Sequence, residues 1–230
     1  MKVNRIAVVG AGLMGSGIAY VSRASGYDVV LTDLDDEAIN RGLSRLKGYV
    51  ESGVKRGKLS PEEGEKILGK LATTTNLTEA VSDVDLVIEA VFENMDIKKK
   101  LFKEMDGAAK PHTILASNTS SLSITELGKV TNRPDKVIGM HYFSPVPAMK
   151  LLEVIVGKET GDETVQTALE VGEKQRKTTV KAIDSPGFIV NRLRAQIGRA
   201  IYQIYEQDLA STEEIDTAMK EKFGVPMGSL

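Results

Sequence analysis

A short apolar segment, residues 6–9, is followed at once by three glycines in the order Gly10-Ala-Gly12-Leu-Met-Gly15. In a strand-to-helix turn, Gly10 permits the tight turn, Gly12 lets the backbone approach a pyrophosphate, and Gly15 lets the helix pack closely on the strand. The first N–H groups of the helix would then face the phosphates. An isolated triplet also fits an ordinary turn, but helix-compatible residues 13–24 follow it. The pattern therefore predicts a dinucleotide site.

An acidic residue lies where such a site needs one. The apolar segment 29–32 ends at Asp33, close to the roughly 20 residues that usually separate the glycines from a ribose-binding carboxylate. Asp33 is expected to accept hydrogen bonds from the adenosine ribose. It also fits a cap for a helix beginning near Asp36, and both roles can hold. Because Asp35 and Asp36 add negative charge that would repel a 2′-phosphate, the sequence favours NAD over NADP.

Composition limits the other classes of function. The 230 residues carry a formal net charge of −2 and no long basic run, so we expect neither a nucleic-acid partner nor a membrane surface as the main target. Cysteine is absent, which excludes disulfides, thiolate metal sites and cysteine nucleophiles, and no metal site is expected. No apolar stretch is long enough to span a membrane, and residues 1–3 lead directly into the first strand without a signal peptide. We expect a cytoplasmic protein.

Apolar, strand-like segments alternate with helical patterns along most of the chain, which predicts an α/β fold with a Rossmann-type, mostly parallel sheet. The segments are 6–9, 29–32, 86–89, 114–116, 137–140 and 151–156. Residues 36–69 read as two helices that project from the sheet as a helical hairpin. The second of these helices should begin with a capping box, in which Ser60 is the cap, Pro61 takes the first helical position and Glu63 completes the box.

The end of the chain has a different character. A helix is expected near residues 163–175, followed by a short strand-like segment at 179–183. The turn-forming sequence Asp184-Ser-Pro-Gly187 then precedes a long helix. A second helix should begin with the capping box 211–214. We therefore predict a nucleotide-binding domain over residues 1–184 and an all-α domain over 185–230. Two helices are little material for an independent core, so this second domain either depends on a partner subunit or is incomplete.

The two histidines differ in setting. His112 follows a proline in a turn, whereas His141 ends an apolar strand, where open α/β sheets build their sites. Glu153 lies within another apolar strand, and a buried charge there requires a partner. If the two strands are neighbours, Glu153 can fix the tautomer of His141 and stabilise its imidazolium, leaving the other nitrogen to take a proton. A satisfied strand-end histidine, and a pair of Glu153 with a lysine or arginine, are the alternatives.

Two further polar groups have open interpretations. The run 117–121 follows a strand and is compatible with a binding loop, or with a plain loop that leads to a cap for the helix starting near Ser123. Asn191 follows three apolar residues near the start of the long helix, where it could equally face water.

Several motifs in this order resemble the 3-hydroxyacyl-CoA dehydrogenases, above all the short stand-alone members that act on 3-hydroxybutyryl-CoA. The resemblance covers essentially the whole chain. The motifs are Gly10-Ala-Gly-Leu-Met-Gly15, Ala116-Ser-Asn-Thr-Ser-Ser-Leu-Ser-Ile124, His141-Tyr-Phe-Ser-Pro145, Met149-Lys-Leu-Leu-Glu153, Ser185-Pro-Gly-Phe-Ile-Val-Asn-Arg192 and Ile215-Asp-Thr-Ala-Met-Lys220.

The resemblance implies roles for individual residues. It makes His141 the catalytic base and Glu153 its orienting carboxylate, and it places Ser120 and Asn191 at the reacting oxygen of an acyl-CoA substrate. For NAD it implies contacts from the glycine turn, from Asp33 and from residues near the nicotinamide half, so that the implied cofactor residues are Gly10, Gly12, Leu13, Met14, Gly15, Asp33, Glu93, Lys98 and Ser120.

Some of these positions have a simpler interpretation. Glu93 and Lys98 could form a surface ion pair of little consequence. The basic cluster Lys55, Arg56 and Lys58, at the end of the hairpin, matches a region that meets the phosphates of CoA in the family, and an ordinary solvated face fits it equally well.

The sequence departs from the family pattern in two places. Ser144 stands where the family often has asparagine, which changes the donors available for setting the substrate and histidine geometry. Ser229 stands where proline is expected, and family members continue beyond this point with helices that complete the substrate pocket and a homodimer interface. The chain is therefore expected to be a truncated product or a part of a longer one.

The expected reaction is reversible hydride transfer between C3 of a short (S)-3-hydroxyacyl-CoA and NAD. Two other functions remain open from the sequence. One is an NAD-dependent dehydrogenase of another hydroxy acid, such as a sugar acid, on the same scaffold. The other is a catalytically silent NAD-binding protein with an interaction role.

Overall fold

The computed structural model describes residues 1–69 and 71–224 of the chain. The chain divides into two compact units, Met1–Pro186 and Gly187–Leu230. The sequence placed a domain boundary close to this division, after residue 184.

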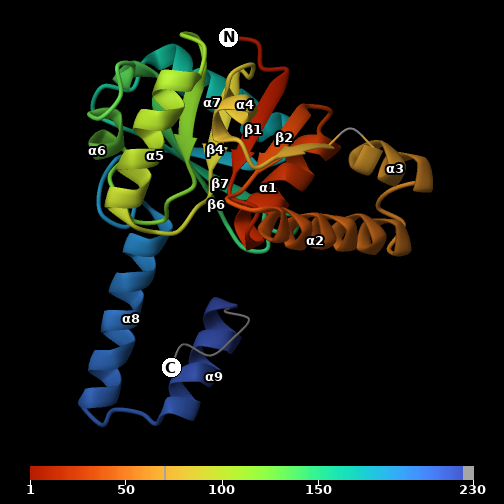
Figure 1. The fold of residues 1–230 in the computed structure, drawn as a ribbon. Coiled ribbons are helices and arrows are strands. Elements are labelled where there is room, and N and C mark those ends of the chain that lie inside the picture. Colours follow the sequence, from red (N-terminus) through yellow and green to blue (C-terminus); the bar gives the residue numbers. More distant parts are fainter. Residues whose placement is uncertain (70, 225–230) are drawn as a thin grey trace. The chain divides into compact units, whose positions relative to one another are not determined.

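The described residues of the first unit form an eight-stranded sheet in the order β3-β2-β1-β4-β5-β6-β7-β8 (Figure 1). Neighbouring strands are parallel except for β6 and β7, so the predicted mostly parallel sheet is confirmed. The strands are β1 Arg5–Val9, β2 Asp28–Thr32, β3 Leu71–Thr74, β4 Leu86–Glu89, β5 Ile114–Ser117, β6 Val137–Tyr142, β7 Leu151–Val156 and β8 Thr178–Ile183. Strand β3 was not predicted, because it has only four residues, two of them threonines, and none is fully buried.

The strands are joined by helices, as βα alternation requires. They are α1 Leu13–Ala24, α2 Asp36–Lys55, α3 Pro61–Gly69, α4 Leu77–Val81, α5 Met95–Ala108, α6 Ile124–Gly128, a 3₁₀ turn at Pro134–Lys136, and α7 Asp162–Lys174. Figure 1 shows the outer part of α2 and α3 extending beyond the sheet as the expected hairpin. The capping box of α3 is present, since Ser60 N donates to Glu63 Oε2 at 2.7 Å and Glu63 N to Ser60 Oγ at 3.2 Å.

The core lies along the central strands. Every residue of β4 and β5 is buried, as expected for parallel strands with both faces covered. The carboxyl ends of β1, β2, β4, β5 and β6 all meet at one edge of the sheet, because these strands are parallel to one another. Functional groups of open α/β sheets collect at this edge, called the carboxyl edge below.

The second unit contains α8 Val190–Glu206 and α9 Thr212–Phe223. The expected capping box opens α9, where Ser211 and Glu214 exchange hydrogen bonds. Large apolar side chains are exposed along α8, among them Leu193 and Tyr202. Ser229 lies outside the described residues.

Candidate active site

Strands β6 and β7 bring the two candidate proton-transfer residues together. Their antiparallel register places His141 opposite Glu153. Nδ1 of His141 lies 2.7 Å from Oε2 of Glu153. Glu153 is fully buried, and His141 is 5% exposed. The contact expected for neighbouring strands is therefore present at the carboxyl edge.

The hydrogen bond fixes the chemistry of the imidazole. A carboxylate only accepts hydrogen bonds, so Nδ1 of neutral His141 carries the proton and Nε2 is the accepting nitrogen. The ring of Phe143 packs against the imidazole with centroids 4.5 Å apart. An imidazole oriented in this way can take a proton at Nε2, and the buried carboxylate then stabilises the imidazolium.

The glycine turn has the shape of a phosphate cradle. Gly10 has φ of 101°, and a Cβ there would lie 2.7 Å from Ala90 O; a Cβ on Gly15 would lie 1.7 Å from Gly10 O. Gly12 differs, because its Cβ would meet nothing within 4 Å. Gly12 is the N-cap of α1 and its helix start has no acidic residue in the first turn and no side-chain cap. The first N–H groups of α1 therefore suit an anion that approaches over Gly12.

Asp33 lies beside this turn at the end of β2. Its Oδ2 accepts from Ala11 N at 2.6 Å and its Oδ1 from Leu34 N at 2.7 Å. These contacts hold the carboxylate beside the glycine turn. The alternative role as a helix cap is wrong: Asp35 caps α2 by accepting from Ala38 N, because it is the residue directly before the helix.

A buried ion pair lies behind the loops of the carboxyl edge. Lys98 Nζ contacts the two carboxylate oxygens of Glu89 at 2.8 and 2.9 Å and Oε2 of Glu93 at 3.4 Å. Lys98 is 1% exposed and Glu89 is fully buried. The alternative of a surface pair is therefore wrong, because α5 directs Lys98 into the protein.

Glu93 joins this pair to the loop after β5. Its Oε1 accepts from Thr119 Oγ1 at 2.6 Å, from Ser120 N at 3.0 Å, and from the hydroxyls of Ser120 and Ser121 at 3.3 Å. Burial alone would raise the pKa of Glu93, but the hydrogen bonds from Thr119 and Ser120 and the charge of Lys98 outweigh burial and lower it. Glu93 is thus an ionised acceptor that organises the Ser120 loop.

The remaining candidates have mixed settings. Ser144 is exposed and precedes a cis peptide bond to Pro145 in the loop between β6 and β7. Leu13 is exposed at the start of α1, and Met14 packs against the core.

Asn191 lies at the start of α8 in the second unit. The basic residues Lys55, Arg56 and Lys58 are exposed at the turn between α2 and α3. The expected cap of α6 is confirmed, since Ser123 accepts from Glu126 N.

Glu89 and Ser117 join the site only through the structure. They are register partners on β4 and β5, and Ser117 Oγ donates to Glu89 Oε1. The signal that identified Glu153, a carboxylate within an apolar strand, also holds for Glu89. Nothing in the sequence assigns a carboxylate partner to Ser117.

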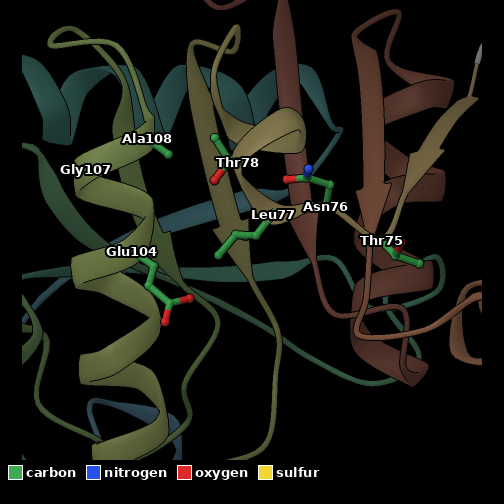
Figure 2. A pocket seen from close by; sticks show the side chains of 7 residues that line it. All are labelled: Thr75, Asn76, Leu77, Thr78, Glu104, Gly107 and Ala108. Atoms are coloured by element: carbon green, nitrogen blue, oxygen red, sulfur yellow. The ribbon is translucent and has the colours of Figure 1, made fainter.

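Other kinds of site receive no support from the described residues. In residues 1–69 and 71–224, no group of three or more His, Cys, Asp or Glu side chains could hold a metal ion. None of the helices described combines the length and apolar character that a membrane crossing demands. Figure 2 shows a surface hollow between the segment 75–78 and the later part of α5; its lining contains none of the candidate residues.

Two family models match the chain. One, described as 3-hydroxyacyl-CoA dehydrogenase, NAD binding domain, matches residues 5–185. The other, described as 3-hydroxyacyl-CoA dehydrogenase, C-terminal domain, matches residues 187–230.

Individual proteins are similar over nearly the whole chain. A probable 3-hydroxybutyryl-CoA dehydrogenase of Bacillus subtilis is 46% identical over 231 residues, which cover 100% of this chain and 80% of the relative. The mitochondrial hydroxyacyl-coenzyme A dehydrogenase of Homo sapiens is 41% identical, with 98% of this chain and 74% of the relative covered. The crystal structure of (S)-3-hydroxybutyryl-CoA dehydrogenase from Ralstonia eutropha superposes with a TM-score of 0.96 at 37% identity, covering 100% of this chain and 81% of that one.

Proposed function

The chain belongs to the 3-hydroxyacyl-CoA dehydrogenase family, which catalyses NAD-dependent oxidation of 3-hydroxyacyl-CoA, and from this premise we propose that its own substrate is (S)-3-hydroxybutyryl-CoA. The product is acetoacetyl-CoA, and the reaction runs in both directions. The short acyl chain is supported by the names of relatives in Bacillus subtilis and Clostridioides difficile. The observation that carries the reaction type is the 2.7 Å contact between His141 Nδ1 and Glu153 Oε2 at the carboxyl edge.

The residues around the glycine turn fit NAD. Space over Gly12 and the helix start suit the pyrophosphate, and Asp33 suits the adenosine ribose. A bound NAD supplies the acceptor for the hydride that leaves C3 of the substrate. The acidic residues Asp33, Asp35 and Asp36 disfavour a 2′-phosphate there.

His141 moves the proton. In the oxidation, its Nε2 takes the proton of the C3 hydroxyl while Glu153 holds Nδ1 and stabilises the imidazolium. In the reduction, the same nitrogen returns the proton to the alkoxide oxygen that forms. His141 is thus the catalytic residue, and Glu153 is a positioning residue that acts through it.

The other candidates bind and orient. The Ser120 hydroxyl, held by Glu93, is a hydrogen-bond partner of the reacting oxygen, and Ser144 helps to set the substrate geometry. The resemblance to the family gives Asn191 a substrate-binding role as well. Lys55, Arg56 and Lys58 meet the phosphates of CoA. We further propose a homodimer through the C-terminal helical domain where that domain is complete, and a cytoplasmic location.

A single assay tests the proposed function. The purified 230-residue chain should oxidise NADH in the presence of acetoacetyl-CoA, and should fail to do so with free acetoacetate or with NADPH as donor. Turnover of the free acid or of a sugar acid instead would identify a different hydroxy-acid dehydrogenase. NADH binding, seen by fluorescence, without turnover of any acyl-CoA would identify a silent NAD-binding protein.

A further inference from the structure

Lys98 is buried among carboxylates at the carboxyl edge. It lies near the start of α5 with 1% of its surface exposed. Its ammonium group contacts both oxygens of Glu89, Oε2 of Glu93 and, at 3.5 Å, Val91 O. An ammonium has three N–H donors, so these neighbours use all of them. Lys98 therefore acts on the site through the carboxylates that it holds.

Glu89 is the fixed end of this arrangement. It closes β4 with its side chain fully buried, and Val9 of β1 and Ser117 of β5 are its register partners. Its carboxylate accepts from Lys98, from Ser117 Oγ and, at 3.2 Å, from Val91 N. Every partner thus comes from a segment of the carboxyl edge. A buried ion pair is in general a weak source of stability compared with apolar packing, which leaves this one without a clear purpose in folding.

The two carboxylates hold the loop after β5 from both sides. Glu89 holds the Ser117 hydroxyl, which in turn accepts from Thr119 N at 3.1 Å. Glu93 holds Thr119 and Ser120 through its Oε1. Lys98 bridges Glu89 and Glu93, so a shift of either carboxylate is transmitted to Ser120.

We propose that Glu89, together with Lys98, is a positioning residue of the reaction, which fixes Glu93 and through it the Ser120 hydroxyl against the reacting oxygen of the substrate. This inference rests on the proposed function, because it gives Ser120 a substrate to meet. It goes beyond that function by placing a reaction requirement on a carboxylate that touches neither substrate nor cofactor. Lys98 serves as the bridge between the two carboxylates.

A matched pair of variants tests the proposal. Glu89→Gln keeps the size of the side chain but removes its charge and turns one acceptor into a donor facing Lys98 or Ser117. Asp106→Asn makes the same change at the other end of α5, where Asp106 is 6% exposed and pairs with Arg133 at 2.6 Å. Both changes weaken a buried ion pair on the same helix, so both lower the thermal midpoint.

Only the first variant should change turnover. We expect Glu89→Gln to lower kcat for acetoacetyl-CoA about 10-fold to 100-fold, as for a small misplacement of a reacting group, with a smaller change in KM. Asp106→Asn should keep the kcat of the parent chain. Equal kcat values in Glu89→Gln and the parent, or equal losses in both variants, would overturn the proposal.

A second variant covers the case in which Glu89→Gln fails to fold. Ser117→Ala removes one hydrogen bond to Glu89, and we expect a smaller loss of kcat and faster hydrogen exchange at the Ser120 amide, which Glu93 otherwise protects. An unchanged kcat and exchange rate in Ser117→Ala would contradict the proposal.

The exchange measurement also separates this inference from the proposed function. If the parent chain turns over no acyl-CoA, the proposed function fails by that result alone. The positioning of Ser120 is then judged by amide exchange at residues 118–121, which Glu89→Gln should accelerate and Asp106→Asn should leave unchanged. No difference between these two variants would overturn it.

Discussion

The two histidines of the chain both pair with a carboxylate, but the two pairs lie in contrasting regions. His112 Nε2 is 3.4 Å from Asp85 Oδ1, at the edge where β4 and β5 begin, and 49% of the His112 side chain is exposed. His141 Nδ1 is 2.7 Å from Glu153 Oε2, where β6 approaches its end, and the exposure of these side chains is 7% and 0%. Water competes for the first pair and is excluded from the second.

The difference shows that the environment, rather than the pair of residue types, makes a proton-transfer site. Asp85 also accepts from the backbone N–H groups of Asn4 and Arg5, so it joins the starts of two strands. Glu153 comes from the strand facing His141 and orients its ring. Only the second pair lies at the carboxyl edge, where the glycine turn also lies. Substitutions at the carboxyl edge should therefore change turnover, whereas substitutions at the opposite edge should change stability alone.

The largest effect is expected at His141. His141→Ala removes the general base, and loss of such a group typically lowers kcat by about 10² to 10⁴. NADH binding measured by fluorescence should stay close to that of the parent chain, because the glycine turn and Asp33 are untouched. A nearly normal kcat with acetoacetyl-CoA would show that His141 has no part in the chemistry.

The next largest effect is expected at Glu153. In Glu153→Gln the amide can donate to Nδ1, which moves the imidazole proton to Nε2 and removes the accepting nitrogen. We expect kcat to fall about 10²-fold, with a much smaller change in NADH affinity. Asp85→Asn is the matched control at the exposed pair and should retain the parent kcat. Equal turnover of Glu153→Gln and Asp85→Asn would contradict the orienting role.

The contribution of Glu93 to the stability of the fold should depend on pH. Its pKa in the folded state lies below the ordinary value of about 4.3, so between these two values the unfolded chain binds more protons. The stability that Glu93 contributes is complete above about pH 5 and is lost as the pH falls through its folded-state pKa. The difference in unfolding free energy between the parent and Glu93→Gln should therefore be constant from neutral pH to about pH 5 and shrink on further acidification. Urea unfolding at a series of pH values measures it, and a difference that persists in acid would contradict it.

Sequence patterns were sufficient where local chemistry decides the structure. The glycine turn, the capping boxes before α3 and α9 and most strands were predicted, because the signal and the structure it specifies lie within a few residues. The pair of His141 and Glu153 was also accessible, since a hairpin of two apolar strands brings a carboxylate and an imidazole into register.

The features that the sequence did not predict depend on contacts between residues far apart along the chain. Strand β3 is short, has no fully buried residue, and is defined by its parallel pairing with β2. The sequence matched Lys98 to a cofactor position and left a surface pair with Glu93 as the alternative, and only its contact with Glu89 in the structure shows that it is buried. Glu89 carries the same signal as Glu153, but its partners Ser117 and Lys98 come from separate segments whose proximity follows from the sheet order.

The smallest effect is expected at His112. His112→Ala removes an exposed pair with Asp85, and pairs of this kind contribute at most about 1 kcal/mol to stability because water and salt screen them. Asp85 retains its two backbone donors, so the starts of β1 and β4 stay joined. We expect the parent kcat and a slightly lower thermal midpoint, measured beside His141→Ala under the same conditions. A loss of kcat at His112 comparable to that at His141 would mean that the reaction does not belong to the carboxyl edge.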